Sequence, residues 1–298
     1  MRWRWLWGLV PISIGLVIAL MIFFSESSNP IIYVQSDLGI LIIILGLGVS
    51  LLVVLTIAVL DWVEKIQIET IIQSADNRRR FLRRLDHELK NPLTAILAGL
   101  ANISMAEDIN TRASALQSVQ NQVDRLRRLV TELRKLSDLE IRPLDQSPIN
   151  MTELLEDAFR LAQELPGSDG KTLNLSIPRA PWPLPTINGD RDLLILAIHN
   201  LLDNAIKFSH PNDTIEMRAF EDGSDIIIEI ADTGPGIPIS DQSQVWEELY
   251  RGEQARGIPG SGLGLALVRA IVSRHEGSIS LRSRPGEGTV FTLRLPNR

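Results

Sequence analysis

The chain has 298 residues, a formal net charge of −6 and no cysteine. This length accommodates a membrane anchor and two modest soluble units. The negative balance argues against a broad nucleic-acid-binding surface, so we expect no nucleic-acid partner. The lack of cysteine excludes disulfides, thiolate metal sites and cysteine nucleophiles.

Two apolar stretches near the N-terminus are long enough to cross a bilayer. Residues 5–24 contain no charge over 20 residues, and residues 38–60 contain none over 23. A helix over the second stretch, at about 1.5 Å per residue, exceeds the roughly 30 Å hydrocarbon core. The alternative for the first stretch is a cleaved signal peptide, but its apolar region exceeds the usual ~7–15 residues and no small-residue cleavage site follows. The sequence therefore predicts a membrane anchor over residues 1–60.

Positive charge predicts how this anchor is oriented. Arg2 and Arg4 precede the first span, and Lys65 follows the second together with a group of arginines. Residues 25–37 between the spans contain neither Lys nor Arg. Both termini are therefore expected in the cytoplasm of a multi-pass protein of the plasma (inner) membrane. The external loop at 25–37 is too short to fold a ligand-binding domain.

Two amphipathic helices are predicted after the anchor. Residues 61–78 contain neither Pro nor Gly and are interpreted as a helical signalling linker. A first helical face follows at 81–100, and a polar turn is expected at 106–110. The next helix carries a heptad seam: Leu116, Val119, Val123, Leu126, Val130 and Leu133. An antiparallel helical hairpin over residues 79–140, paired with a second copy as a dimeric four-helix bundle, buries both seams. The alternative is a monomeric hairpin packed on the C-terminal domain.

Strands and helices in mixed order follow the hairpin, after a proline-containing linker at 141–149. This order predicts an α+β sandwich over residues 148–298, not a parallel doubly wound sheet. Helices are expected at 151–162, 191–208 and 264–275, and strands at 173–177, 214–220, 225–231, 278–283 and 289–295. The last four strands are predicted to form two hairpins.

Three segments of this domain have the composition of a nucleotide pocket. The first is Asp232-Thr233-Gly234-Pro235-Gly236, directly after an apolar strand. A carboxylate at a strand end can accept a hydrogen bond from an exocyclic amine such as that of adenine, and the glycines let the backbone approach a planar ligand. Alone, the segment is also compatible with an ordinary strand-ending turn.

The second segment is the run Gly260-Ser261-Gly262-Leu263-Gly264, which leads into a predicted helix. Backbone N–H groups in glycine-rich chain at a helix N-terminus can bind anionic phosphate. A dinucleotide-binding fold is disfavoured because a loop precedes these glycines where that fold has a strand.

The third segment places Asn200, Asn204 and Lys207 on one helix face, at positions i, i+4 and i+7. Amide oxygens can ligate Mg²⁺, and an ammonium group can contact phosphate. A solvated helix face would explain this segment by itself. The three segments together favour a nucleotide site.

A histidine with an adjacent carboxylate lies on the first predicted hairpin helix, in the run His87-Glu88-Leu89-Lys90-Asn91. Imidazole is a good nucleophile near neutral pH, and Glu88 can orient the ring or accept its proton. A zinc protease would need histidine where Asn91 stands, so that alternative fails. A solvated helix histidine is the remaining alternative.

Together these motifs resemble those of membrane-bound sensor histidine kinases, whose ATP-binding domain is of the histidine-kinase/Hsp90/gyrase ATPase type, also found in mismatch-repair ATPases. The resemblance covers about residues 81–298 and keeps the family's motif order. It implies ATP and Mg²⁺ as cofactors, phosphorylation of His87, and transfer to an aspartate of a response regulator receiver domain. It also implies phosphatase activity through Asn91, which in the family orients a water.

The resemblance further implies a role for each pocket residue. Asn204 is the main Mg²⁺ ligand with Asn200 beside it, and Lys207 contacts phosphate. Asp232 binds adenine. The other implied nucleotide-binding residues are Gly234, Gly236, Tyr250, Arg251, Gly260, Gly262, Leu263, Gly264 and Thr289, and Gly286, Gly288 and Thr289 match the family's last glycine motif.

The segment that corresponds to the family's mobile lid departs from the family pattern. Trp246 and Leu249 stand where the family has two phenylalanines before a Tyr-Arg pair. Both residues remain apolar, so packing is expected to persist while lid docking differs. Arg251 keeps a cation available for phosphate.

Two other functions stay open from the sequence. A conformational ATPase of the wider fold would form no phosphohistidine, but it would not require a histidine–carboxylate pair on a dimerising helix. A non-catalytic membrane interaction protein would bind ATP or nothing, and the altered lid is its best argument.

Overall fold

The structure is a computed structural model. It describes residues 14, 16–18, 20–21, 38–105, 108–179, 182–255 and 257–297. Most of the predicted first span and the whole external loop at 25–37 lie outside the described residues. The chain divides into two compact units, Met1–Arg79 and Arg80–Arg298, and each is described by itself.

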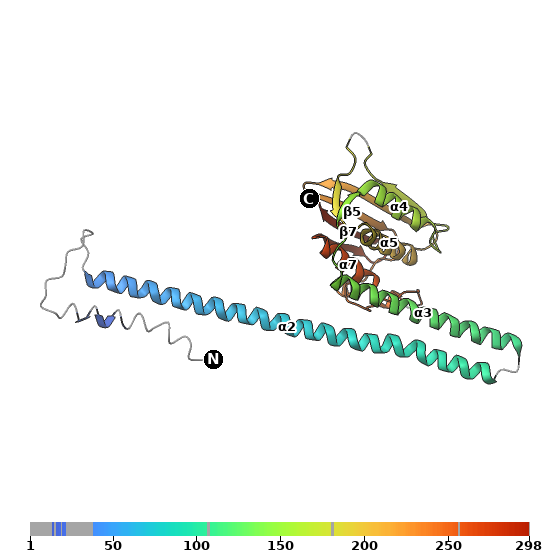
Figure 1. Cartoon of the computed structure of the whole chain (residues 1–298), viewed down its shortest axis with the longest axis horizontal. Helices are drawn as coiled ribbons and strands as arrows, with labels where there is room; N and C mark the ends of the chain where they lie inside the picture. Colours follow the sequence, from blue (N-terminus) through green and yellow to red (C-terminus); the bar gives the residue numbers. More distant parts are fainter. Residues whose placement is uncertain are drawn as a thin grey trace. The chain divides into compact units, whose positions relative to one another are not determined.

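Helix α2 (Leu38–Met105) is a continuous helix of 68 residues (Figure 1). It includes the predicted second span and the predicted linker, so these two segments form one helix. Within the described part of the chain, this is the one helix that is long and apolar enough to cross a membrane, by length and composition. The expected pair of spans therefore has one counterpart among the described residues.

The second unit begins with a hairpin made by the last part of α2 and by α3 (Ile109–Ile141). The carboxylate of Asp108 caps α3 by accepting a hydrogen bond from the Thr111 N–H at 3.1 Å. This cap starts the helix at Ile109. Residues 109 and 110, which were predicted to belong to the turn at 106–110, are therefore part of α3. Helix α2 continues through Pro92, which costs one backbone hydrogen bond without ending the helix.

The predicted seam of α3 is only partly covered by α2. Val119 is half-buried and contacts the other helix, since a Cβ added to Gly99 would lie 2.5 Å from the Val119 Cγ2 atom. Leu116, Val123 and Val130 recur every seven residues and are 50%, 48% and 54% exposed. The chain by itself therefore leaves an apolar stripe along α3 in contact with solvent.

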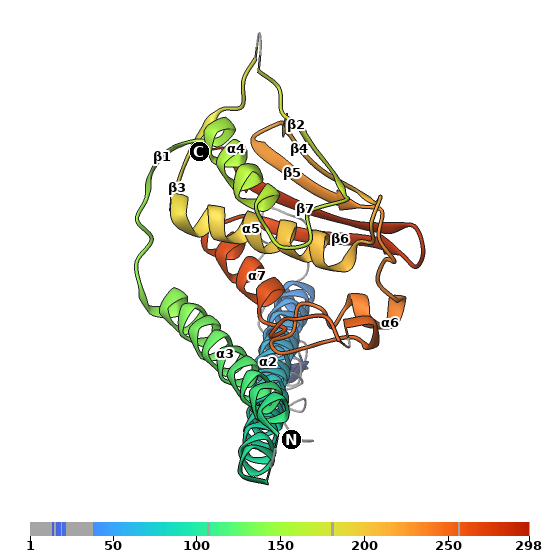
Figure 2. The same cartoon turned by 90° about the vertical axis from the view of Figure 1, so that its right-hand side faces the viewer.

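The C-terminal domain is a two-layer α/β sandwich, as the order of predicted elements indicated (Figure 2). Its sheet has the order β2-β4-β5-β7-β6, with β2 parallel to β4 and the other neighbours antiparallel. The strands are β2 (Thr172–Ser176), β4 (Thr214–Asp222), β5 (Asp225–Asp232), β6 (Ser278–Arg284) and β7 (Gly288–Pro296). The two predicted hairpins, β4–β5 and β6–β7, are confirmed.

Three helices cover one face of this sheet: α4 (Met151–Gln163), α5 (Arg191–Phe208) and α7 (Gly264–Arg274). They bury apolar side chains at intervals of three and four, such as Leu194, Ile198, Leu201 and Ala205 on α5. This buried stripe forces the polar residues of α5 to the opposite side of the helix. The shorter elements are α6 (Ile239–Gln242) and the 3₁₀ helix η2 (Glu253–Ala255).

One sequence prediction in this domain was wrong. Residues 141–149 were predicted to be a linker, but β1 (Ser147–Asn150) pairs with β3 (Thr186–Gly189) in a separate antiparallel ribbon. A ribbon of two strands gives each strand a free edge, which accommodates Pro148 despite its missing N–H group. Four residues are also too few to display a period of two.

Candidate active site

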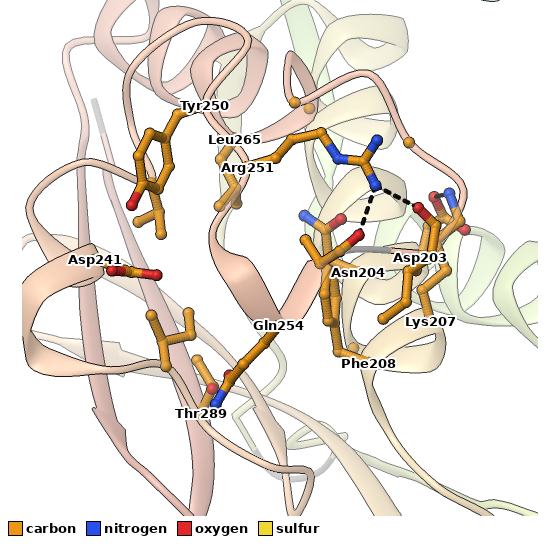
Figure 3. A pocket seen from close by; sticks show the side chains of 18 of the residues that line it. Asp203, Asn204, Lys207, Phe208, Asp241, Tyr250, Arg251, Gln254, Leu265 and Thr289 are labelled. Atoms are coloured by element: carbon orange, nitrogen blue, oxygen red, sulfur yellow. Dashed lines mark hydrogen bonds and ion pairs between the residues drawn. The ribbon is translucent and has the colours of Figure 1, made fainter. Parts of the chain in front are cut away.

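A pocket lies between α5, the end of β5, the start of α7 and the segment 245–262 (Figure 3). Most of the residues predicted to bind nucleotide line it: Asn200, Asn204, Lys207, Asp232, Gly236, Tyr250, Arg251, Gly260, Gly262, Gly264 and Thr289. Segments that are distant in the sequence thus meet around one cavity.

Asp232 is the last residue of β5 and lines this pocket. Burial raises the pKa of its carboxyl from 3.8 to about 6, while hydrogen bonds from the backbone of Gly234 and Thr289 partly oppose the shift. The Gly234 N–H donates to the Asp232 Oδ1 atom at 3.0 Å, and Thr289 lies opposite Asp232 on β7. At neutral pH the group is therefore a desolvated carboxylate that accepts hydrogen bonds.

Gly236 is required by the backbone beside Asp232. Its φ is +71°, and an added Cβ atom would lie 2.1 Å from the carbonyl oxygen of Arg284. Only glycine fits both the left-handed conformation and this close approach. The pocket wall is thus shaped by direct contact between two loops.

Helix α5 presents its polar residues to the pocket. The Asn200 Nδ2 atom donates to the Leu196 carbonyl at 2.7 Å, which leaves the amide oxygen on the side of Gly264. Lys207 forms an ion pair with Asp203 one turn earlier, and both side chains line the pocket. The cation predicted to contact phosphate is therefore engaged by a carboxylate in this structure.

The lid, which we define as residues 245–262, is held by hydrogen bonds between its own residues. The Leu249 N–H donates to the Gly262 carbonyl at 3.0 Å, and Leu249 has a φ of +59°. The Arg251 guanidinium donates to the carbonyls of Ala255 and Ile258 at 2.6 and 2.5 Å (Figure 3). Arg251 thus holds the lid's own backbone.

Both unusual lid residues are packed. The Trp246 ring meets Phe291 of β7 edge to face, with centroids 6.0 Å apart and planes at 87°. Leu249 is 4% exposed and contacts Leu129 of α3 and Leu263. The tryptophan thus anchors the lid to the sheet, and the leucine anchors it to the hairpin.

Tyr250 and Arg84 connect the lid to α2. The Arg84 guanidinium carbon lies 5.2 Å from the centre of the Tyr250 ring. Arg84 also pairs with Glu247 at 2.7 Å and donates to the Glu248 carbonyl at 3.2 Å. Burial and the neighbouring Asp241 raise the pKa of Tyr250.

The remaining predicted site residues do not line the pocket. Leu263 was predicted to contact nucleotide, but it is 1% exposed in the cluster with Leu129 and Leu249, because its side chain faces the hairpin. Gly234 contributes its N–H to Asp232 and is not a lining residue. His87, Glu88 and Asn91 also lie outside the lining.

His87 and Asn91 are exposed on α2, one turn apart. Glu88 projects elsewhere: its carboxylate pairs with Arg125 of α3 at 2.7 Å and is 20% exposed. Successive residues of a helix point about 100° apart, which separates Glu88 from the exposed ring of His87. In this arrangement the histidine has neither the pocket nor its neighbouring carboxylate as a partner.

Other lining residues were not predicted, among them Glu132, Asp203, Asp241, Gln254 and Phe291. Asp203 could have been found from its i, i+4 relation to Lys207. Glu132 had no local signal, because it belongs to α3 and reaches the pocket only through the tertiary fold.

The donors in the pocket suit a hard cation shared with a phosphate ligand. No group of three or more His, Asp or Glu side chains able to hold a metal occurs in the part of the chain that the structure describes. Mg²⁺ is commonly held by one or two protein oxygens plus phosphates and waters, for which the Asn204 amide is suitable.

Two family models match the chain over these two parts. The model "His Kinase A (phospho-acceptor) domain" matches residues 77–141, and the model "Histidine kinase-, DNA gyrase B-, and HSP90-like ATPase" matches residues 189–298. The hairpin with His87 and the domain with the pocket fall in these two regions. The chain belongs to the sensor histidine kinase family.

Several curated proteins are similar to this chain. The sensor-like histidine kinase SenX3 of Mycobacterium tuberculosis is 35% identical over 225 residues, which cover 74% of this chain and 54% of the relative. The phosphate regulon sensor protein PhoR of Pseudomonas aeruginosa is 33% identical, with 72% and 49% covered. The chain thus spans about half the length of the curated relatives it matches.

A solved structure, the histidine kinase AdeS of Acinetobacter baumannii, has the same fold. It superposes with a TM-score of 0.56 at 24% identity, over 71% of this chain and 98% of that one.

Proposed function

We propose that this protein is a membrane-bound sensor histidine kinase that phosphorylates His87 from ATP and passes the phosphoryl group to an aspartate of a response regulator. The observation that carries the proposal is the combination of His87 on a hairpin helix with a pocket built around Asp232, Asn204 and two glycine-rich turns. Family membership supports the same reaction class.

The pocket residues divide the work of binding ATP. The Asp232 carboxylate accepts a hydrogen bond from the adenine amine, and the turn at Gly260–Gly264 offers backbone N–H groups to phosphate. Asn204, with Asn200 beside it, would hold Mg²⁺, which neutralises phosphate charge when it is bound. Lys207 leaves Asp203, and Arg251 leaves the lid carbonyls, so that both cations contact phosphate.

The chemical step is an in-line transfer. A ring nitrogen of His87 attacks the γ-phosphorus, the bond from that phosphorus to the bridging oxygen breaks, and ADP leaves with the electron pair. Glu88 accepts the proton from the other ring nitrogen, which requires it to exchange its contact with Arg125. Since His87 does not line the pocket, the ATP-binding domain must move relative to the hairpin before the step.

Asn91 supports a second activity of the same helix. Its side chain is exposed one turn beyond His87. A carboxamide there can orient a water for attack on the phosphorylated aspartate of the regulator, so the protein is proposed to act as a phosphatase as well.

A homodimer is the proposed functional assembly. The exposed stripe of Leu116, Val123 and Val130 faces solvent in a single chain, and Leu93, Leu97 and Leu100 of α2 are 49%, 68% and 51% exposed. Burying such stripes against a second hairpin yields a four-helix bundle. This favours the dimer over the monomeric alternative.

The membrane is the proposed location, with both termini in the cytoplasm. The apolar first part of α2 supports one span, and residues 5–24 are proposed to supply the other. Because α2 is continuous from the apolar part to His87, a change at the membrane can reach the phosphoacceptor helix directly.

The proposal is tested by incubating the full chain, solubilised in mild detergent, with ATP radiolabelled at the γ-phosphate. Acid-labile label is expected in the wild type, and its loss is expected in His87→Gln. His210→Gln is the matched control, because His210 is a second exposed histidine whose side chain does not line the pocket. Equal acid-labile label in His87→Gln would show that His87 is not the phosphoacceptor, and ATP hydrolysis by the wild type without any acid-labile label would favour a conformational ATPase.

A second assay separates a kinase from a non-catalytic binding protein. Asp232→Asn is expected to lose labelling of His87 by weakening ATP binding. Labelled wild type is expected to pass phosphate to a receiver domain from the same cell. Failure of the wild type to bind any ATP analogue would favour the non-catalytic alternative.

A further inference from the structure

Glu132 brings a negative charge from the hairpin into the nucleotide pocket. It lies on α3, yet it lines the pocket beside the glycine-rich turn. Its carboxylate accepts a hydrogen bond from the hydroxyl of Ser261, 129 residues further along the chain. This carboxylate is the direct polar link between α3 and that turn among the hydrogen bonds found in the described residues.

Ser261 passes this contact on to the start of α7. Its hydroxyl oxygen accepts a hydrogen bond from the Leu263 N–H at 3.0 Å, and Leu263 is the N-cap residue of α7. A helix N-terminus favours an anion through its free N–H groups and its dipole. The Glu132 carboxylate therefore stabilises, through one hydroxyl, the same helix end that would bind phosphate.

Two further contacts hold the lid on the hairpin. Leu129, one turn before Glu132, is 4% exposed against Leu249 and Leu263 at the base of the lid. At the other side of the lid, Arg84 contacts Glu247 and the Tyr250 ring. The lid is thus docked by the apolar contact at Leu129, by the hydrogen bond between Glu132 and Ser261, and by the contacts of Arg84.

The polar contact at Glu132 is incompatible with bound phosphate. A triphosphate carries several negative charges, and like charges a few ångströms apart in a partly buried pocket repel strongly. Docking of the lid through Glu132 and binding of ATP at the glycine-rich turn must therefore weaken each other by the same factor.

We infer that Glu132 is an anionic latch: its carboxylate occupies the end of the pocket proposed to bind phosphate and holds the lid on the hairpin, and the phosphates of ATP displace it. This inference rests on the ATP binding of the proposed function. Displacement frees the lid and the domain that carries it, which then moves to reach His87. The latch thereby couples nucleotide binding to the movement that transfer requires.

The first test compares affinities of the full chain for a non-hydrolysable ATP analogue. Glu132→Gln removes the charge and replaces the charge-assisted hydrogen bond to Ser261 by a weaker neutral one, and it is expected to bind the analogue at least about fivefold more tightly than wild type. Asp138→Asn is the matched control on α3, since Asp138 is outside the pocket and is expected to leave affinity unchanged. Adenosine, which has no phosphate, is expected to bind all three proteins equally.

The second test measures docking without any nucleotide. Because the chain has no cysteine, one spin-label cysteine can be placed at Arg128 of α3 and one at Glu253 of the lid. The distance between labels is expected to increase when wild type binds the analogue, and to be already long in nucleotide-free Glu132→Gln. A short distance in nucleotide-free Glu132→Gln, with unchanged analogue affinity, would overturn the latch.

The two tests keep this inference separate from the proposed function. If the wild type fails to bind the analogue, the proposed function falls, while the label distance in Glu132→Gln still decides whether Glu132 holds the lid. If the analogue binds and Glu132→Gln alters neither affinity nor distance, the latch falls and the kinase proposal stands.

Discussion

Lys207 is ion-paired with Asp203 on α5, and both side chains line the pocket. The pair is partly buried, with side chains 33% and 23% exposed. The cation proposed to contact phosphate is therefore held beside a carboxylate that repels phosphate. Binding of ATP must exchange one partner of Lys207 for another.

Replacing this carboxylate should strengthen ATP binding. Asp203→Asn is expected to bind a non-hydrolysable ATP analogue about two- to fivefold more tightly, since partly exposed charge pairs contribute up to roughly 1 kcal/mol. The gain should shrink as salt concentration rises, because salt screens exposed charges. Calorimetric titration at low and high salt measures both effects. Weaker binding by Asp203→Asn would show that the carboxylate supports the ligand.

Adenosine binding should depend on the protonation of Asp232. The pKa of this carboxyl in the free protein is about 6, and the charged carboxylate is a much stronger acceptor for the adenine amine than the neutral acid is. The affinity is therefore expected to be constant above about pH 7 and to fall below pH 6 by at most about tenfold per pH unit. Adenosine is the appropriate ligand because it has no phosphate that titrates in this range.

The same pKa shift has the opposite sign for stability. A folded-state pKa above the ordinary value of 3.8 means that the neutral form stabilises the ligand-free fold at low pH. This contribution is lost as pH rises through about 6.

A flat adenosine affinity between pH 5 and 7.5 would contradict the assignment of Asp232 to the adenine amine.

Gly236→Ala should be much more damaging than an alanine at an ordinary turn glycine. The new Cβ would lie 2.1 Å from the Arg284 carbonyl at a φ of +71°, so both strain and overlap oppose it. We expect a loss of about 2–5 kcal/mol in folding free energy. Gly223→Ala is the control, with a φ of +63° and open space around it, and should lose only about 1 kcal/mol. Thermal melting temperatures compare the two, and equal shifts would contradict the close contact.

A charge in the exposed stripe of α3 should separate the proposed dimer. Val123→Glu places a carboxylate where the second hairpin is expected to pack, so monomers should appear with unchanged helix content. Gln120→Glu, at an exposed polar position one turn away, should remain dimeric. Light scattering of the detergent-solubilised chain gives the mass, and circular dichroism gives the helix content. If the Val123→Glu variant remains dimeric, the dimer interface does not include this stripe of α3.

Local patterns in the sequence were sufficient for most elements and motifs. Helix α5 was predicted with its observed ends, because Asp190 caps it and its apolar residues recur every three or four positions. The β4–β5 hairpin followed from two apolar runs around a glycine turn. The ribbon of β1 and β3 was missed, since strands of four residues carry no measurable period.

The sequence by itself determined the family, the helical hairpin and the types of residue that make the pocket, because periodicity and motif spacing are local properties. Only the tertiary structure decided which partners those residues have. Glu132 meets Ser261, Arg84 meets the lid, and Glu88 meets Arg125 across 37 or more positions. Such contacts arise when packing of apolar faces brings separate elements together, and no local pattern encodes them.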